Sequence, residues 1–211
     1  LGDVYKRQIA RKAAPALAVG CAMIVKPASL TPLSAYALAV LAYESGMPQD
    51  LLPVVSGSAS EISHEFATNP TVRKISFTGS TEVGAKIFAD SAADIKKLSL
   101  ELGGNAPFIV FDDADLDKAV EGALASKFRN SGQTCVCTNR VYAQSGIYDE
   151  FCRKLSEKVA ALKLGNGLDE GVNQGPLIEE KAVEKVEQHI ADALSKGAVC
   201  LTGGKRSALC G

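Results

Sequence analysis

The sequence contains no tryptophan, only two histidines, and no long apolar run. A stretch of about 18 apolar residues, the length needed to span a bilayer, is missing. A signal peptide with a basic start and an apolar middle is missing as well. Charge is nearly balanced, with 23 Lys and Arg against 24 Asp and Glu, so no basic surface for nucleic acid or anionic lipid is indicated. We therefore expect a cytoplasmic protein that binds neither nucleic acid nor a membrane.

Cysteine is present but scattered. The 211 residues, 46% of them hydrophobic, are enough for one large domain or two smaller ones, so no disulfide framework is needed. A reducing compartment is the simpler interpretation for the six cysteines. They occupy positions 21, 135, 137, 152, 200 and 210.

Apolar runs alternate with helical patterns through the first hundred residues, which predicts an α/β fold with a parallel sheet. Residues 1–8 lack periodicity and are interpreted as a non-native addition. Thr31 before Pro32 predicts a helix N-cap, and Gly46 predicts that helix's end. The expected strands are 21–25, 51–55, 74–77 and 96–101, and the expected helices are 9–18, 31–46, 58–68 and 80–93.

The segment Gly103-Gly104-Asn105 interrupts this rhythm and predicts a boundary between two domains, residues 9–102 and 103–211. A second sheet is expected to follow it. Its expected strands are 107–111 and 140–144, and the expected helices run to residue 129 and over 148–163 and 179–196.

Residues 112–117 contain four acidic side chains, which raises the possibility of a divalent metal site. No second acidic cluster stands nearby in a metal-ligand pattern. Capping of the following helix and compensation of its dipole explain the acids more simply. We predict no metal site.

A strand, a glycine turn and a helix start are predicted around Gly79 and Ser80. The glycines at 79 and 84 have the spacing of a P-loop, but Ala85 stands where that motif requires lysine. Free N–H groups at the helix start can still face a pyrophosphate, and an ordinary βα turn is the alternative.

Two reactive side chains lie in glycine-rich, polar settings. Cys135 ends the segment Gly132-Gln133-Thr134-Cys135, whose residues are not typical of a core, and we predict that it is a nucleophile. Its backbone N–H can also donate to an oxyanion. Glu101 precedes two glycines that allow close approach of a ligand, and we predict that it is a base that activates water. An inert core thiol and a solvated carboxylate are the alternatives.

Three motifs occur in this order: residues 77–84, 101–104 and 132–135. Together they resemble the aldehyde dehydrogenase superfamily, and residues 126–137 resemble its succinate-semialdehyde dehydrogenase branch. The resemblance covers residues 9–208, less than half of such an enzyme. It implies part of a Rossmann-like cofactor domain followed by part of an α/β catalytic domain. The Trp-Asn-Phe-Pro segment, the oxyanion-binding Asn and a cofactor-binding Glu of the family are missing, so we expect residues 1–211 to be inactive alone.

The resemblance implies a nicotinamide cofactor held by two segments. Gly79 and Ser80 would bind the pyrophosphate, and Leu102 would contact the nicotinamide side through its backbone. Lys26, Pro27, Ala28 and Ser29 would hold the adenosine ribose. Many NAD-specific relatives have Glu where this chain has Ser29, so a 2′-phosphate is not repelled. The expected cofactor is NADP, with NAD possible.

The resemblance also implies a small-molecule semialdehyde as substrate. Arg11 and Arg129 match positions that hold the substrate carboxylate, although an arginine at a helix C-terminus is more commonly a dipole partner. Succinate semialdehyde is expected, with glutarate semialdehyde as the alternative because one methylene discriminates weakly. The complete enzyme is expected to be a homo-oligomer.

Cys137 has two open roles: packing, or forming a reversible disulfide with Cys135. Two residues apart in a regular strand, both thiols would lie on one face. Two other functional classes remain as alternatives to an enzyme: a non-catalytic remnant of the fold and a thiol redox module.

Overall fold

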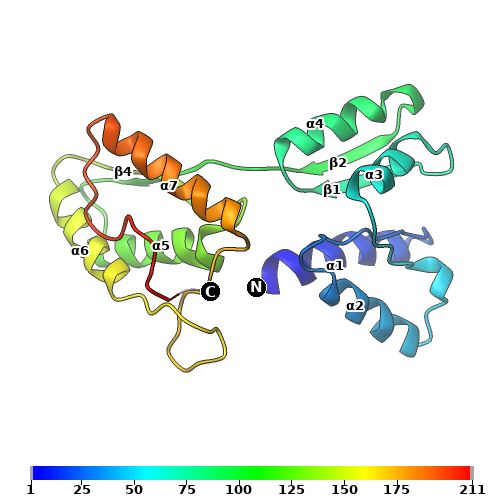
Figure 1. Ribbon diagram of the computed structural model, residues 1–211, viewed down its shortest axis with the longest axis horizontal. Coiled ribbons are helices and arrows are strands. Elements are labelled where there is room, and N and C mark those ends of the chain that lie inside the picture. The colour runs from blue at the N-terminus through cyan, green and yellow to red at the C-terminus, as the bar shows by residue number, and fades with distance from the viewer. Residues whose placement is uncertain (1, 210–211) are drawn as a thin grey trace. The chain divides into compact units, whose positions relative to one another are not determined.

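The computed structural model describes the backbone of residues 2–209 and the side chains of residues 8–209. The chain divides into two compact units, Leu1–Gly103 and Gly104–Gly211 (Figure 1). Both contain helices and a parallel strand pair, which confirms the α/β fold class. In the described part of the chain, no helix is long and apolar enough to cross a membrane.

The first unit contains a parallel pair of strands in the C-terminal part of its sequence. β1 (Lys74–Thr78) pairs with β2 (Lys97–Glu101) in parallel, so that Thr78 lies opposite Glu101 at the carboxyl ends of both strands. α4 (Thr81–Asp90) connects the two. These strands and this connection follow the sequence prediction closely. The remaining elements are α1 (Gly2–Ala18), α2 (Leu33–Glu44), η1 (Gln49–Leu51), α3 (Ala59–Thr68) and η2 (Ala92–Asp94).

The strands expected over residues 21–25 and 51–55 are reduced to one bridge, Val25 to Val54. The backbone N–H groups of Met23 and Val25 still donate to the carbonyls of Leu51 and Pro53. Pro53 has no N–H to donate in return, so the ladder cannot be continuous there. The prediction of two full strands is therefore wrong, although the segments do run in parallel.

The expected starts of the first two helices need correction. α1 begins at Gly2 and not at residue 9, so it includes residues predicted to precede the first helix. α2 begins at Leu33, with Pro32 at the N-cap and no side-chain capping bond. Thr31 is therefore not the cap; its Oγ1 is buried and has no hydrogen-bond partner among the described residues. Gly46, with φ of 93°, follows the end of α2 as predicted.

The second unit is built on another parallel pair. β3 (Ala106–Val110) pairs with β4 (Thr138–Ala143), and α5 (Leu116–Phe128) and α6 (Tyr148–Ala160) pack together beside them (Figure 1). The core cluster contains Val110, Val120, Ala123 and Phe151. The 3₁₀ turn η3 (Arg129–Gly132) and the helix α7 (Glu180–Ser195) complete the unit.

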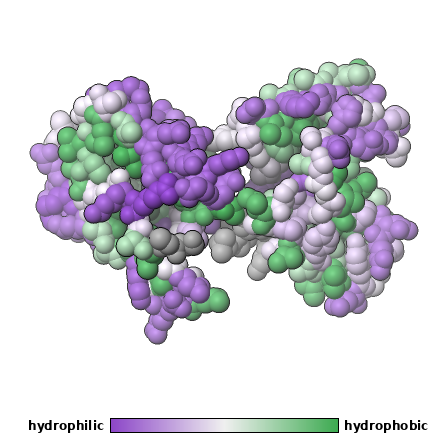
Figure 2. Space-filling model, in the orientation of Figure 1, coloured by the Kyte–Doolittle hydropathy of each residue, from purple (hydrophilic) through white to green (hydrophobic). Residues whose placement is uncertain are grey.

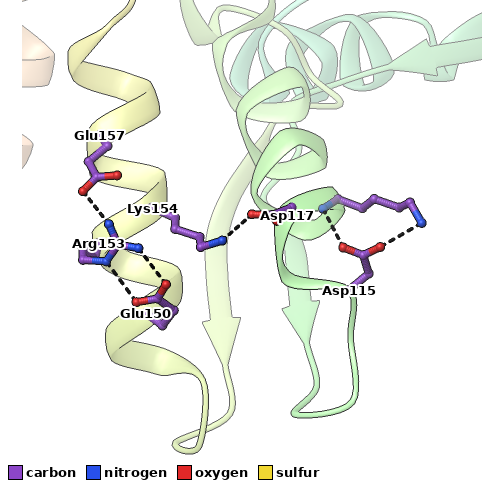
Figure 3. Close-up of polar contacts among 7 residues, drawn as sticks. Asp115, Asp117, Glu150, Arg153, Lys154 and Glu157 are labelled. Atoms are coloured by element: carbon purple, nitrogen blue, oxygen red, sulfur yellow. Dashed lines mark hydrogen bonds and ion pairs between the residues drawn. The ribbon is translucent and has the colours of Figure 1, made fainter.

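The acidic segment before α5 is explained by capping. Asp115 is the N-cap and accepts a hydrogen bond of 3.2 Å from the Lys118 N–H (Figure 3). Bonding to Lys118 lowers the pKa of Asp115. Asp117 pairs with Lys154 of α6 and so joins the two helices. Among the described residues no group of three or more His, Cys, Asp or Glu could hold a metal ion.

Large apolar side chains remain at the surface of both units (Figure 2). In the second unit, Ile109 and Tyr142 are paired across β3 and β4, and both are more than half exposed. On the first unit, Leu33 and Leu41 of α2 are exposed as well. A two-stranded sheet buries little apolar surface, and these apolar side chains remain exposed. The small buried apolar area limits the stability of each unit.

Candidate active site

Cys135 lies in a turn after a strained stretch of backbone. Arg129 is the C-cap of α5, and the next three residues, Asn130, Ser131 and Gly132, all have positive φ, at 51°, 54° and 78°. Only glycine adopts this conformation without cost, and non-glycine residues in it concentrate at functional sites. The backbone that leads to the thiol is therefore held in an uncommon conformation.

Side chains of this loop fix it in place. The Gln133 side chain donates to the Asn130 carbonyl and accepts the Ile178 N–H at 2.9 Å. The Ser131 hydroxyl donates to the Gly175 carbonyl at 3.0 Å. The polar residues before Cys135 thus position the loop against the segment that precedes α7. The side chains of Gln133 and Ser131 are therefore used for hydrogen bonds within the protein.

The two thiols of the Cys135-Val136-Cys137 segment have opposite environments. Cys135 is exposed, whereas Cys137 is 1% exposed. The Cys137 Sγ lies 2.7 Å from the Thr134 Oγ1 and 3.6 Å from the Lys127 carbonyl. The segment is a turn, closed by the Cys137 N–H on the Thr134 carbonyl, so the expectation that a strand places both thiols on one face is wrong. The packing role of Cys137 is favoured.

Close packing requires glycine at position 104, which the sequence alone does not indicate. A Cβ at this position would collide with the carbonyl oxygen of Cys135. The backbone of Gly104 therefore passes directly against the residue that carries the thiol. The sequence indicates only that glycine at this position allows a ligand to approach.

Glu101 is the last residue of β2 and is exposed. Its Oε1 lies 2.7 Å from the Nη2 of Arg11 on α1. The next residue on α1, Lys12, donates from Nζ to the Thr78 hydroxyl at 2.6 Å. Burial, and secondly the charge of Arg11, lowers the pKa of Lys12. Two predicted site residues from distant parts of the sequence are thus in contact.

Gly79 and Ser80 form the turn between β1 and α4. Ser80 is the N-cap of α4 and accepts the Val83 N–H at 3.2 Å. A Cβ at Gly79 would collide with the Phe77 ring. Further along α4, a Cβ at Gly84 would meet the side chain of Leu102. Local packing therefore accounts for both glycines, and the N-terminus of α4 is the kind of helix end at which an anion can bind.

Lys26 and Ser29 lie together in the loop after Val25. The Lys26 Nζ donates to the Pro27 carbonyl at 2.8 Å and lies 3.4 Å from the Ser29 hydroxyl. Pro27 is buried, and the Ala28 carbonyl accepts the Thr31 N–H at 3.1 Å. An ammonium beside a hydroxyl, with no carboxylate between them, is a donor set suited to ribose or phosphate oxygens.

The predicted residues therefore fall into two groups, one in each unit. The first unit contains the cofactor candidates together with the bonded pair Arg11 and Glu101, and the second contains Cys135, Cys137 and Arg129. Arg129 is exposed at the end of α5. Sequence reasoning missed Lys12 and Thr78, whose only signal was their position beside Arg11 and Gly79.

A family model described as the aldehyde dehydrogenase family matches residues 7–210, nearly the whole chain. The chain belongs to the aldehyde dehydrogenase family. It is 66% identical over 197 residues to the NADP-dependent succinate-semialdehyde dehydrogenase of Escherichia coli, covering 93% of this chain and 41% of that protein. It is 64% identical to the glutarate-semialdehyde dehydrogenase of Pseudomonas aeruginosa, covering 96% of this chain and 42% of that enzyme.

Solved structures agree with this membership. A succinate-semialdehyde dehydrogenase from Burkholderia pseudomallei is 61% identical and superposes with a TM-score of 0.94, covering 95% of this chain and 42% of that one. This aldehyde dehydrogenase chain thus spans about two fifths of the length of the relatives that it matches.

Proposed function

We propose that this aldehyde dehydrogenase chain is part of an enzyme that oxidises a short aldehyde carrying a carboxylate, with succinate semialdehyde as the substrate. The observation that carries the proposal is the exposed Cys135 thiol on a loop fixed by Gln133 and Ser131. The similarity to dehydrogenases of two semialdehydes supports the substrate class. In this proposal the first unit binds the cofactor and the second carries the nucleophile.

The proposed chemistry uses Cys135 and Glu101 in sequence. The Cys135 thiolate adds to the aldehyde carbon, and backbone N–H groups stabilise the alkoxide that forms. A bound nicotinamide cofactor supplies the acceptor for the hydride that leaves this carbon. Cys135 then carries a thioester. Glu101 takes a proton from water as the water oxygen attacks the thioester carbon, the C–S bond breaks, and the Cys135 thiolate returns.

The first unit offers groups that fit such a cofactor. The capped start of α4 at Ser80 suits a pyrophosphate, and Lys26 with Ser29 suits the adenosine ribose. Because Ser29 is uncharged, a 2′-phosphate meets no repulsion there. We therefore propose NADP as the preferred cofactor, with NAD accepted.

Replacing Ser29 with glutamate should weaken NADP binding more than NAD binding. A carboxylate facing the 2′-phosphate costs roughly 1–4 kcal/mol, whereas it can accept hydrogen bonds from the ribose hydroxyls of NAD. The measurement is calorimetric titration of both cofactors on residues 1–211 and on the variant. Ala37→Glu, which adds the same charge on an exposed position of α2, is the control. An equal loss for both cofactors would show that the 2′-phosphate is recognised elsewhere.

The function itself is best tested in a full-length enzyme in which residues 9–208 replace the matching segment of the E. coli relative, called the chimera below. We propose that residues 1–211 alone do not turn over, since they span about two fifths of those relatives, and they serve as the baseline. The chimera should oxidise succinate semialdehyde far better than butanal, an uncharged aldehyde of equal length. Failure to oxidise any aldehyde would support a non-catalytic remnant.

Arg129 should account for part of this preference. Arg129→Ala in the chimera should cost about 2–5 kcal/mol in kcat/KM for succinate semialdehyde, because a carboxylate loses a charged hydrogen-bond partner. Butanal should lose much less. If both aldehydes lose equally, Arg129 is structural. Glutarate semialdehyde is the alternative substrate, and one added methylene changes binding by only about 1–3 kcal/mol, so the three aldehydes are compared side by side.

A further inference from the structure

Arg11 and Glu101 have separate roles in the proposed function, yet they are bonded to each other. Their Nη2 and Oε1 atoms are 2.7 Å apart, and the side chains are 39% and 51% exposed. A ligand can therefore reach both partners. The pair links the residue expected to hold the substrate carboxylate with the residue expected to activate water.

The local structure explains why these two side chains meet. Glu101 ends β2 directly opposite Thr78, the last residue of β1. α1 places two neighbouring cations there, and each binds one strand end: Lys12 binds the Thr78 hydroxyl and Arg11 binds the Glu101 carboxylate. Lys12 is half-buried and bonded to Thr78, so Arg11 is the more accessible cation for an incoming anion.

An incoming carboxylate must compete with Glu101 for Arg11. From this geometry we propose that Arg11 binds two carboxylates in turn: it holds Glu101 while the substrate site is empty, and the substrate's carboxylate then displaces Glu101 and frees it to activate water. The proposal rests on the proposed function, and it makes Arg11 a positioning residue for Glu101. Such an exposed pair is weak enough to be exchanged for another carboxylate.

Acid and neutral aldehydes should then respond in opposite directions when Arg11 is removed. A thioester that carries a carboxylate occupies Arg11, so Glu101 is free in the original enzyme. A neutral thioester leaves the ion pair in place, so the Glu101 carboxylate stays bonded to Arg11 and is less available to take a proton from water. Loss of Arg11 should therefore weaken binding of the acid aldehyde but accelerate hydrolysis of the neutral thioester.

The experiment compares Arg11→Gln with the unmodified chimera, using succinate semialdehyde and butanal. Decay of the acyl-enzyme on Cys135 is followed by quenching and intact-mass measurement after a single turnover. The butyryl-enzyme should be hydrolysed about 1.4- to 5-fold faster in Arg11→Gln, which corresponds to the release of one exposed ion pair. KM for succinate semialdehyde should rise at the same time, and Arg11→Lys should restore part of the binding.

A second measurement does not depend on Arg11 variants. In Glu101→Gln the competitor is gone, so the dissociation constant of succinate should fall about 1.4- to 5-fold, and only while Arg11 is present. The double variant Arg11→Gln with Glu101→Gln tests whether the tighter binding of succinate requires Arg11. A general loss of negative charge would tighten binding in the double variant as well. Arg73→Gln, an exposed arginine of the same unit, should change neither result.

The possible outcomes separate this inference from the function. If Arg11→Gln slows hydrolysis of both thioesters, or leaves the butyryl-enzyme unchanged, the exchange of carboxylates is wrong. If succinate binds equally to the original enzyme and Glu101→Gln, the competition is wrong. If the chimera oxidises no aldehyde, the proposed function fails instead.

Discussion

Replacing Cys135 with alanine is expected to abolish aldehyde oxidation by the chimera while cofactor binding persists. The other described thiols differ from Cys135 in burial or in position: Cys137 is buried and Cys152 is half-buried on α6. The exposed Cys21 lies in the first unit, and the exposed Cys200 follows α7, outside the loop that Gln133 and Ser131 fix. Without a nucleophile neither the covalent adduct nor the thioester can form. Removal of a nucleophile costs at least about 10³-fold in rate. The measurements are steady-state reduction of NADP and calorimetric titration of the cofactor.

Two controls make the Cys135 result specific. Cys21→Ala removes an exposed thiol from the first unit and should leave turnover unchanged. Cys137→Ala removes the buried thiol beside Thr134 and should lower thermal stability more than the rate constant. Substantial turnover by Cys135→Ala, or equal losses in all three variants, would remove Cys135 from the mechanism.

Regular elements of this chain could be read from local patterns. β1, β2 and α4 follow the sequence prediction because alternating apolar residues and a capping serine act within a few positions. The same holds for Asp115 at the start of α5. Such signals depend only on neighbours along the chain.

The sequence predictions are wrong where the local structure depends on partners far along the chain or on an uncommon backbone conformation. Pro53 interrupts hydrogen bonding with the segment around Val25, and Pro32 rather than Thr31 precedes α2. Asn130 and Ser131 adopt positive φ although neither is glycine. Asparagine tolerates this conformation but serine rarely adopts it, so residue type alone does not predict the turn. A second turn, closed by the Cys137 N–H on the Thr134 carbonyl, separates the environments of Cys135 and Cys137.

The sequence indicates candidate residues for the site but not the contacts that they make. Arg11 and Glu101 are far apart in sequence, and only the tertiary structure of the first unit brings their side chains together. The contact between Lys12 and Thr78 depends on the tertiary structure in the same way. Residue type indicates what chemistry a side chain can perform, whereas its availability depends on the partner it already holds.

Glu101→Gln gives the second large expected effect. In the chimera it should allow one rapid burst of reduced NADP, because adding the thiol and losing the hydride do not require the carboxylate. Steady turnover should then fall by about 10²–10⁴-fold, because glutamine cannot take a proton from water. Stopped-flow absorbance resolves the burst from the slow phase, and intact mass should show the acyl group retained on Cys135.

Glu44→Gln, at an exposed carboxylate at the end of α2, is the matched control and should behave as the original enzyme. A lost burst with equally slow steady turnover would instead mean that Glu101 activates the Cys135 thiol. The ion pair with Arg11 sharpens this distinction. Under the proposed exchange, Glu101→Gln leaves Arg11 available for the substrate carboxylate, so we expect the stall to lie at hydrolysis of the thioester and not at substrate binding.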